Sequence, residues 1–186
     1  MSGIGHLELV GAAQHVTDGS VGTLRLRIDG STAGVLTSYD LAALRSCDCP
    51  GEIDVIHLIS GQLVGWLASG SRGLVGLTLG ATAALAPDID LLGPTIGAVA
   101  MWKLPGPLSL EGQLAVTSIT FVAVDSRAAL VLRVGALQFF AGYRYAYLND
   151  KAQVDDVERS DTLAGPFAAI GFTWEPHRGA PASHRR

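Results

Sequence analysis

Charged side chains recur at alternate positions of several apolar segments. Arg25 and Arg27 alternate with apolar residues in TLRLRID, and Glu111 and Arg144 follow the same rule in LSLEGQLAVT and LQFFAGYRYAYL. Side chains at alternate positions of a β-strand share one face, and charges enclosed on such a face must be paired or hydrated. If this face lines a closed barrel, the expected chemistry is an Arg–Glu network that fills the interior, or else a narrow passage that favours anions.

The predicted interior set consists of the polar residues that share this parity. Arg133 and Arg144 belong to adjacent segments and need acids or water between them, for which Glu111 is the nearest candidate. The full set is Glu8, Arg25, Arg27, Gln62, Glu111, Gln113, Arg133, Gln138 and Arg144.

Residues that could form a catalytic site are sparse. His57 lies near Asp54, and His15 lies near Asp18, at what would be the outer ends of strands. Neither pair comes with a defined nucleophile or an oriented base. The glycines of GLVGLTLGATAAL lack the GK[ST] signature of a phosphate-binding loop. We therefore expect no enzyme, and a hydrolase site at the rim of the barrel is the catalytic alternative.

Two further motifs could bind a metal or form a cross-link. The segment DKAQVDDVERSD could bridge calcium through its carboxylates, but it lacks the ligand spacing and glycine of a calcium loop, so a solvated loop is favoured. Cys47 and Cys49 could close a strained disulfide in an oxidising compartment or remain free thiols, and two cysteines are too few for a zinc site. We expect no metal and no cofactor. The acidic residues of the segment are Asp150, Asp155, Asp156, Glu158 and Asp161.

The elements that carry these residues are predicted to be strands, because the hydrophobic period is two rather than 3.6. A helix would spread the charges around its circumference. At about 9 to 14 residues, the segments are long for a soluble sheet and close to the ~9–11 residues that a tilted strand needs to cross a bilayer. The ten predicted strands are 5–15, 20–29, 32–40, 53–66, 72–84, 91–104, 107–118, 122–134, 137–149 and 164–174.

The connections between the predicted strands alternate between short and long. Turns such as SGSR and PGP alternate with longer segments, of which 41–52 and 150–163 are the longest. Outer-membrane barrels alternate in this way, with tight periplasmic turns and longer extracellular loops. An even number of strands returns both ends of the chain to the same side.

The composition agrees with a membrane barrel. The 186 residues are 48% hydrophobic and 16% charged, with a net charge of −4 and a mean hydropathy of +0.35. This composition excludes a disordered chain, and scattered arginines with a negative net charge disfavour a nucleic-acid binder. The longest uncharged stretch, 55–71, falls short of the roughly twenty apolar residues that a transmembrane helix needs.

Aromatic residues gather near the ends of the predicted strands, as in the interfacial girdles of membrane barrels. The parity of Ser60 and Gln62 would point Trp66 into the barrel unless a bulge returns it to lipid. The predicted interfacial residues are Trp66, Trp102, Trp174, Tyr143, Tyr145 and Tyr147.

The segments AGYRYAYL and LAGPFAAIGFTW, with the acidic loop between them, resemble the closing hairpin of small bacterial outer-membrane β-barrel proteins of the porin-like and OmpA-like kind. Ile170, Phe172 and Trp174 match the alternating apolar residues and final aromatic that the barrel-assembly machinery reads in the last strand of that family. Ala169 stands where the family usually has glycine, and a polar tail follows Trp174. The resemblance implies an integral protein of the bacterial outer membrane, with the lipid bilayer and the assembly machinery as its partners.

We therefore predict an all-β, closed, antiparallel up-and-down transmembrane barrel of about ten strands over residues 1–174, with eight strands as the fallback. Residues 175–186 are predicted to form a flexible polar tail. No signal peptide is visible at the start of the chain, and we expect that it was removed or not included. The expected role is structural or that of a small-solute channel. The alternative is a soluble lipocalin-like barrel that binds a hydrophobic small molecule, with the apolar parity facing inward.

Overall fold

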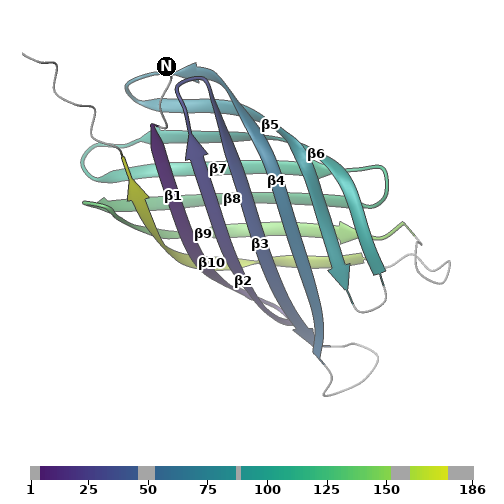
Figure 1. The fold of residues 1–186 in the computed structure, drawn as a ribbon. Helices are drawn as coiled ribbons and strands as arrows, with labels where there is room; N and C mark the ends of the chain where they lie inside the picture. The colour runs from purple at the N-terminus through teal and green to yellow at the C-terminus, as the bar shows by residue number, and fades with distance from the viewer. Residues whose placement is uncertain (1–4, 46–52, 87–88, 152–159, 176–186) are drawn as a thin grey trace, which may run out of the picture.

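Ten antiparallel strands close into one barrel in the computed structural model, which describes residues 5–45, 53–86, 89–151 and 160–175 (Figure 1). Each strand pairs with its neighbour along the chain, and β10 returns to pair with β1. The predicted fold class is confirmed, with ten strands rather than eight. The strands are β1 (His6–Val16), β2 (Gly19–Asp29), β3 (Ala33–Arg45), β4 (Ile53–Ser69), β5 (Gly73–Ala86), β6 (Ile89–Lys103), β7 (Leu108–Thr117), β8 (Val122–Val134), β9 (Leu137–Asn149) and β10 (Ser160–Trp174).

β3 and β10 extend furthest beyond the lengths that the hydrophobic alternation predicts. β3 continues to Arg45, through a segment expected to be a loop, because Ala43 and Arg45 pair with Val55 and Ile53 of β4. β10 begins at Ser160 rather than at 164, and Ser160 pairs with Asn149 of β9. In both cases pairing with a neighbouring strand extends a segment whose own composition does not read as a strand.

The apolar side chains face outward and the charged side chains face inward. Phe139 and Tyr143 are 42% and 55% exposed, whereas Glu111 and Arg144 are 8% and 6% exposed. This is the reverse of a soluble barrel, whose apolar parity would be buried. The lipocalin-like alternative is therefore not favoured. Among the described residues, no helix is long and apolar enough to cross a membrane.

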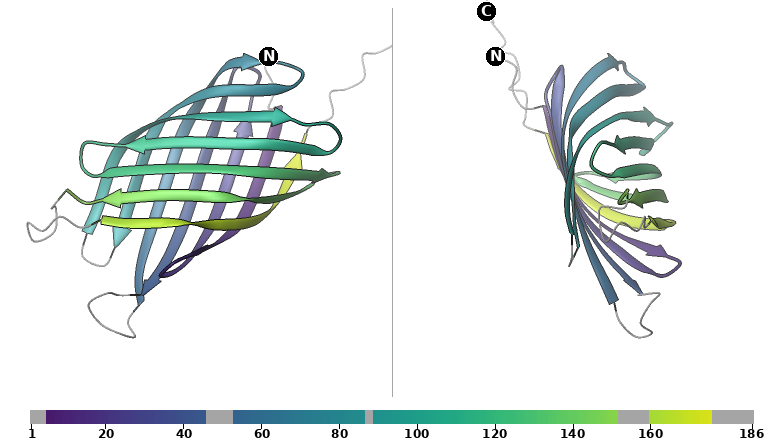
Figure 2. Two further views of the ribbon diagram at one scale, coloured as in Figure 1. Left: turned by 180° about the vertical axis from the view of Figure 1, so that it is seen from behind. Right: turned by 90° about the vertical axis from the view of Figure 1, so that its right-hand side faces the viewer.

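The two ends of the barrel differ. Leu7 of β1 pairs with Trp174 of β10, so the chain enters and leaves the barrel at one end, which we call the terminal end. The opposite end, where β1 turns into β2 and β3 finishes, is the loop end. The wall formed by β1–β5 crosses the wall formed by β6–β10 at a steep angle (Figures 1 and 2). At the terminal end, Gly135 makes the tight β8–β9 turn with φ of +63°, a conformation that favours glycine.

Candidate functional site

Arg144 of β9 is clamped between two aspartates inside the barrel. Its Nε and Nη2 atoms donate to the carboxylate of Asp125 on β8 at 2.9 and 2.7 Å. Its Nη1 and Nη2 atoms donate to the carboxylate of Asp40 on β3, each at 2.9 Å. Thr23 also donates a hydrogen bond to Asp40 and accepts one from Arg144 at 3.3 Å. This Arg144 clamp joins strands on opposite walls through two planar, charge-assisted pairs.

A second ion-pair network lies nearer the terminal end. Arg25 of β2 forms ion pairs with Glu8 of β1, at 3.1 Å, and with Glu111 of β7. The amide of Gln138, oriented to satisfy its neighbours, donates to Glu8 at 2.8 Å and accepts from Arg133 at 2.6 Å. The side chains of Arg25, Glu8 and Glu111 are at most 7% exposed. These three charges are thus paired with one another.

Arg27 and Trp66 form a third interior group. The guanidinium of Arg27 lies 2.8 Å from a carboxylate oxygen of Asp29 and 5.0 Å from the centre of the Trp66 ring. Trp66 therefore faces the interior, and its prediction as an interfacial residue is wrong. A β-bulge does interrupt β4, but it lies between Trp66 and Ala68, one position too late to turn Trp66 outward.

Uncharged polar side chains complete the lining between these networks. Arg127 donates to the amide oxygen of Gln113. The hydroxyls of Thr82, Thr95 and Thr117 form a ladder across β5, β6 and β7, with oxygen distances of 2.8 and 2.7 Å. The hydroxyl ladder cross-links adjacent strands without adding charge, whereas Arg127 brings a charge that its neutral partner Gln113 does not offset.

The remaining interior is closed by apolar side chains. At the loop end, Val16, Val21, Ala42, Ala146 and Leu163 form a buried cluster, each no more than 3% exposed. Among the described residues, one interior cavity has a volume of about 40 Å³ and another a volume of about 20 Å³. A single water molecule needs roughly 10–15 Å³ of such space. Each cavity therefore holds at most a few waters.

The nine residues predicted for the interior all occupy inward-facing positions, although Arg133 lies at the terminal rim with 38% of its side chain exposed. Glu111 was the predicted partner of Arg133 or Arg144, and this prediction is wrong. Glu111 binds Arg25, whereas Arg133 lies 3.5 Å from Glu175.

Four interior charged residues escaped the sequence prediction. Asp125 and Arg127 share the parity of Arg133 on β8, so the alternation itself could have identified them. Asp29 and Asp40 lie at or near the ends of their predicted strands, where parity carries little weight. No sequence signal indicates that Asp40 binds Arg144, because 104 residues separate them.

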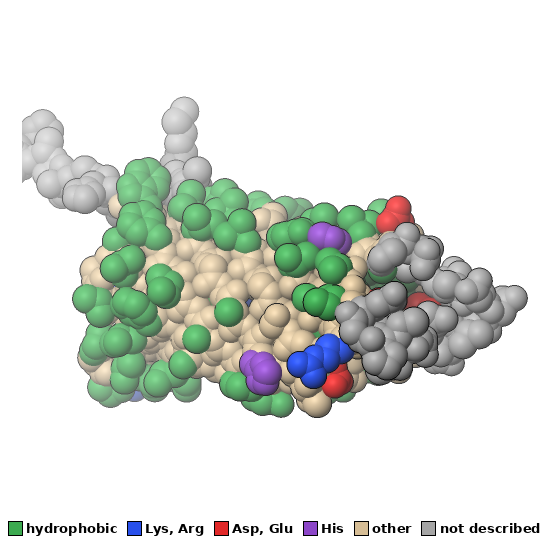
Figure 3. All heavy atoms as spheres, turned by 90° about the horizontal axis from the view of Figure 1, so that it is seen from below, with side chains coloured by type: hydrophobic (Ala, Val, Ile, Leu, Met, Phe, Trp, Pro, Cys, Tyr) green, Lys and Arg blue, Asp and Glu red, His purple; other side chains and the backbone are tan. Residues whose placement is uncertain are grey.

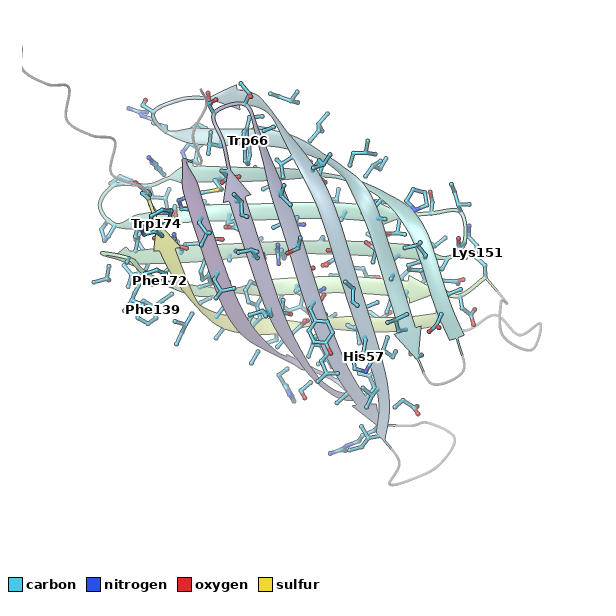
Figure 4. The ribbon with its side chains drawn as sticks, viewed as in Figure 1. His57, Trp66, Phe139, Lys151, Phe172 and Trp174 are labelled. Atoms are coloured by element: carbon cyan, nitrogen blue, oxygen red, sulfur yellow. The ribbon has the colours of Figure 1, made fainter. Side chains whose placement is uncertain are left out.

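The other predicted interfacial aromatics lie on the outer surface. Trp102 and Trp174 are 53% and 52% exposed. Both lie at the terminal end, where Trp102 pairs with Gly73 and Trp174 is labelled in Figure 4. Tyr145 is 42% exposed toward the loop end of β9, whereas Tyr147 is an exception, because it is half-buried and lines the interior cavity of about 40 Å³. Tyr143 is also outward but is the central residue of the 13-residue β9, so it lies away from either strand end.

The structure separates the residues considered for catalysis. His57 faces outward, and its Nδ1 atom lies 2.7 Å from the hydroxyl oxygen of Tyr39. Asp54 is three residues away and therefore lies on the opposite face of β4. No cluster of metal-ligating side chains occurs within the described residues. Cys47, Cys49, Asp155, Asp156 and Glu158 lie outside the described residues.

The closed antiparallel barrel, with large apolar side chains exposed outside and charged side chains enclosed inside, is the architecture of an outer-membrane β-barrel protein. No protein-family model and no curated protein matches the chain. Among solved structures, it is similar to Neisserial surface protein A, at 15% identity and a TM-score of 0.34, over 90% of this chain and 94% of that one. The assignment of the architecture therefore rests on the strand order, register and exposure described above.

Proposed function

We propose that this chain is an integral protein of the bacterial outer membrane with a structural, non-enzymatic role and a closed lumen. The outward belt of leucine, isoleucine and aromatic side chains supports membrane integration. Closure of the barrel pairs the edges of the sheet, as hydrocarbon requires of a spanning structure.

The filled interior is the observation that carries the structural role. Ion pairs, hydroxyl ladders and apolar clusters of the described residues occupy the lumen, and the two interior cavities between them have volumes of about 40 and 20 Å³. A conducting pore needs a continuous aqueous path, as in barrels of 16 or more strands. Side chains that join opposite walls, as Arg144 and Asp40 do, block such a path.

Planar-bilayer recording tests the closed lumen. The refolded full chain should show no unitary current in concentrated potassium chloride, whereas a 16-stranded porin inserted into the same bilayer provides the positive control. Reproducible unitary currents from the purified chain would show an open lumen and favour the channel role.

Gel mobility and vesicle binding test membrane integration separately. The folded barrel should run at a different apparent mass from the boiled chain, and it should stay with lipid vesicles through an alkaline wash. A detergent-free, soluble monomer would contradict the membrane location whatever its conductance.

A further inference from the structure

The outer wall carries an apolar groove across β9, β10, β1, β2 and β3. Its volume is about 780 Å³, within the ~300–1,000 Å³ range of ligand-binding pockets. The floor is formed by small outward residues, and bulkier side chains rise on both sides. In the view of Figure 3, few apolar side chains cover the middle of the molecule, while they gather toward its edges. The floor consists of Gly11, Ala13, Gly22 and Ala168, and the flanks of Leu24, Tyr39, Leu41, Phe139 and Ile170.

Basic and imidazole side chains lie on the loop-end side of this groove. His15 is the next outward residue of β1 after Ala13, about 7 Å further along the strand. His57 pairs with the groove residue Leu41 in the β3–β4 register. Arg45 is exposed on the same wall, two outward positions beyond Leu41. We call His15, Arg45 and His57 the basic rim.

The basic rim is continuous with the groove, and its side chains form no ion pair with a described carboxylate. Tyr39, which flanks the groove, lies in hydrogen-bond contact with His57. Within residues 5–45, 53–86, 89–151 and 160–175, no ion pair involves Arg45, His15 or His57. Asp18 in the adjoining turn accepts a backbone hydrogen bond from Arg45 at 2.8 Å.

We propose that this wall binds one anionic, phosphate-bearing lipid of the leaflet at the loop end, for which phosphatidylglycerol serves as the probe. Its acyl chain lies in the groove, and its phosphate accepts hydrogen bonds from the basic rim. Arginine suits this role because its planar guanidinium can donate two parallel hydrogen bonds to a phosphate, and a histidine ring N–H can donate a further one. The proposal depends on the membrane integration proposed above.

Charge favours a lipid over a second copy of the chain. Two barrels inserted in the same direction would meet about a two-fold axis along the membrane normal. This axis would bring the basic rims of both copies to the same depth and close together, with like charges opposed. An anionic lipid supplies the complementary charge instead.

Native mass spectrometry of the full chain in neutral detergent tests the site. We expect one saturable phosphatidylglycerol per barrel, retained about tenfold more tightly than phosphatidylcholine with the same acyl chains, because its net charge complements the rim. Inorganic phosphate should not displace it, since phosphate cannot occupy the groove. Displacement by inorganic phosphate, or equal retention of the two lipids, overturns the proposal.

Two sets of variants separate the groove from the rim. Replacing both Ala13 and Ala168 with leucine fills the groove and should abolish selective retention. The combined change His15→Gln, Arg45→Gln and His57→Gln should remove the preference for phosphatidylglycerol while leaving residual phosphatidylcholine binding.

Matched controls place equivalent changes elsewhere on the barrel. Ala100→Leu with Ala128→Leu adds the same bulk at exposed, outward positions of β6 and β8, and Arg72→Gln removes a charge beyond the other end of the barrel. These variants should bind as the unchanged chain does. Equal loss in the controls and the groove variant overturns the proposal, as does dimerisation that only the groove variant abolishes.

The heat-dependent gel mobility of every variant shows whether its barrel has folded. This measurement separates a failure of the lipid site from a failure of membrane integration. A barrel that integrates into membranes but retains no phosphatidylglycerol overturns the lipid site alone. A chain that never integrates overturns the membrane location on which the site depends.

Discussion

The Arg144 clamp shows how single residues set the stability of this interior. Arg144→Met should lower the free energy of unfolding by about 3–5 kcal/mol, because it leaves the buried carboxylate of Asp40 without its cation. Urea unfolding of the barrel in lipid vesicles, followed by tryptophan fluorescence, measures the loss. Adding Asp40→Asn and Asp125→Asn to Arg144→Met should recover much of it, because the uncompensated charges are then gone.

Arg133 provides the matched control for this substitution. Its side chain is 38% exposed, and it lies 3.5 Å from Glu175, which is itself 63% exposed. Arg133→Gln should therefore cost less than about 1 kcal/mol, as is usual for a solvent-exposed ion pair. Equal losses for Arg133→Gln and Arg144→Met would argue against a special contribution of the clamp.

The three tryptophans should report different environments. Trp102 and Trp174 are exposed on the outer wall, whereas Trp66 faces Arg27 inside. In single-tryptophan variants reconstituted with brominated lipids, we expect strong quenching of Trp102 and Trp174 and weak quenching of Trp66. Equal quenching of all three would contradict the inward position of Trp66.

At the scale of strands, close approach between neighbours depends on inward-facing glycines. A Cβ atom at Gly80 of β5 would collide with the backbone carbonyl of Gly61 on β4, whereas a Cβ at Gly61 would meet nothing within 4 Å. Gly80→Ala should destabilise the barrel by about 1–3 kcal/mol, the usual cost of overpacking. Gly61→Ala is the control and should change the urea midpoint little. The reverse order of the two variants would contradict the described β4–β5 packing.

The strands themselves could be predicted because their signal is local. Alternation in TLRLRID or LQFFAGYRYAYL specifies both a strand and the face of each side chain. Strand ends are harder to predict from the sequence, because pairing with the neighbouring strand determines where a strand stops. The extension of β3 to Arg45, which pairs with β4, is an example.

Contacts between side chains across the lumen cannot be predicted from this local alternation. Whether Glu111 binds Arg25 or Arg144 depends on the stagger of strands around the closed barrel, a property of the whole sheet. The alternation in β4 correctly points Trp66 into the barrel. What the sequence does not reveal is that the bulge lies after Trp66, where it cannot turn this side chain outward.

For the whole molecule, the direction of insertion can be tested. We expect the loop end to face the cell exterior and the terminal end the periplasm, as in other membrane barrels. In a Cys47→Ser, Cys49→Ser background, Asp18→Cys at the loop end should react with a membrane-impermeant maleimide on intact cells. Arg72→Cys at the terminal end should react only after permeabilisation. The opposite labelling pattern would reverse the orientation.

The span of the Arg144 clamp has a consequence for assembly. Asp40 and Arg144 are 104 residues apart and belong to β3 and β9, so they meet only when the sheet has curved far enough to bring both walls together. Until that moment, an open sheet in hydrocarbon would carry unneutralised charges on one face. Seam formation between β1 and β10 and charge neutralisation are therefore coupled steps. A partly inserted intermediate therefore has a high free energy, and the last stage of folding is cooperative.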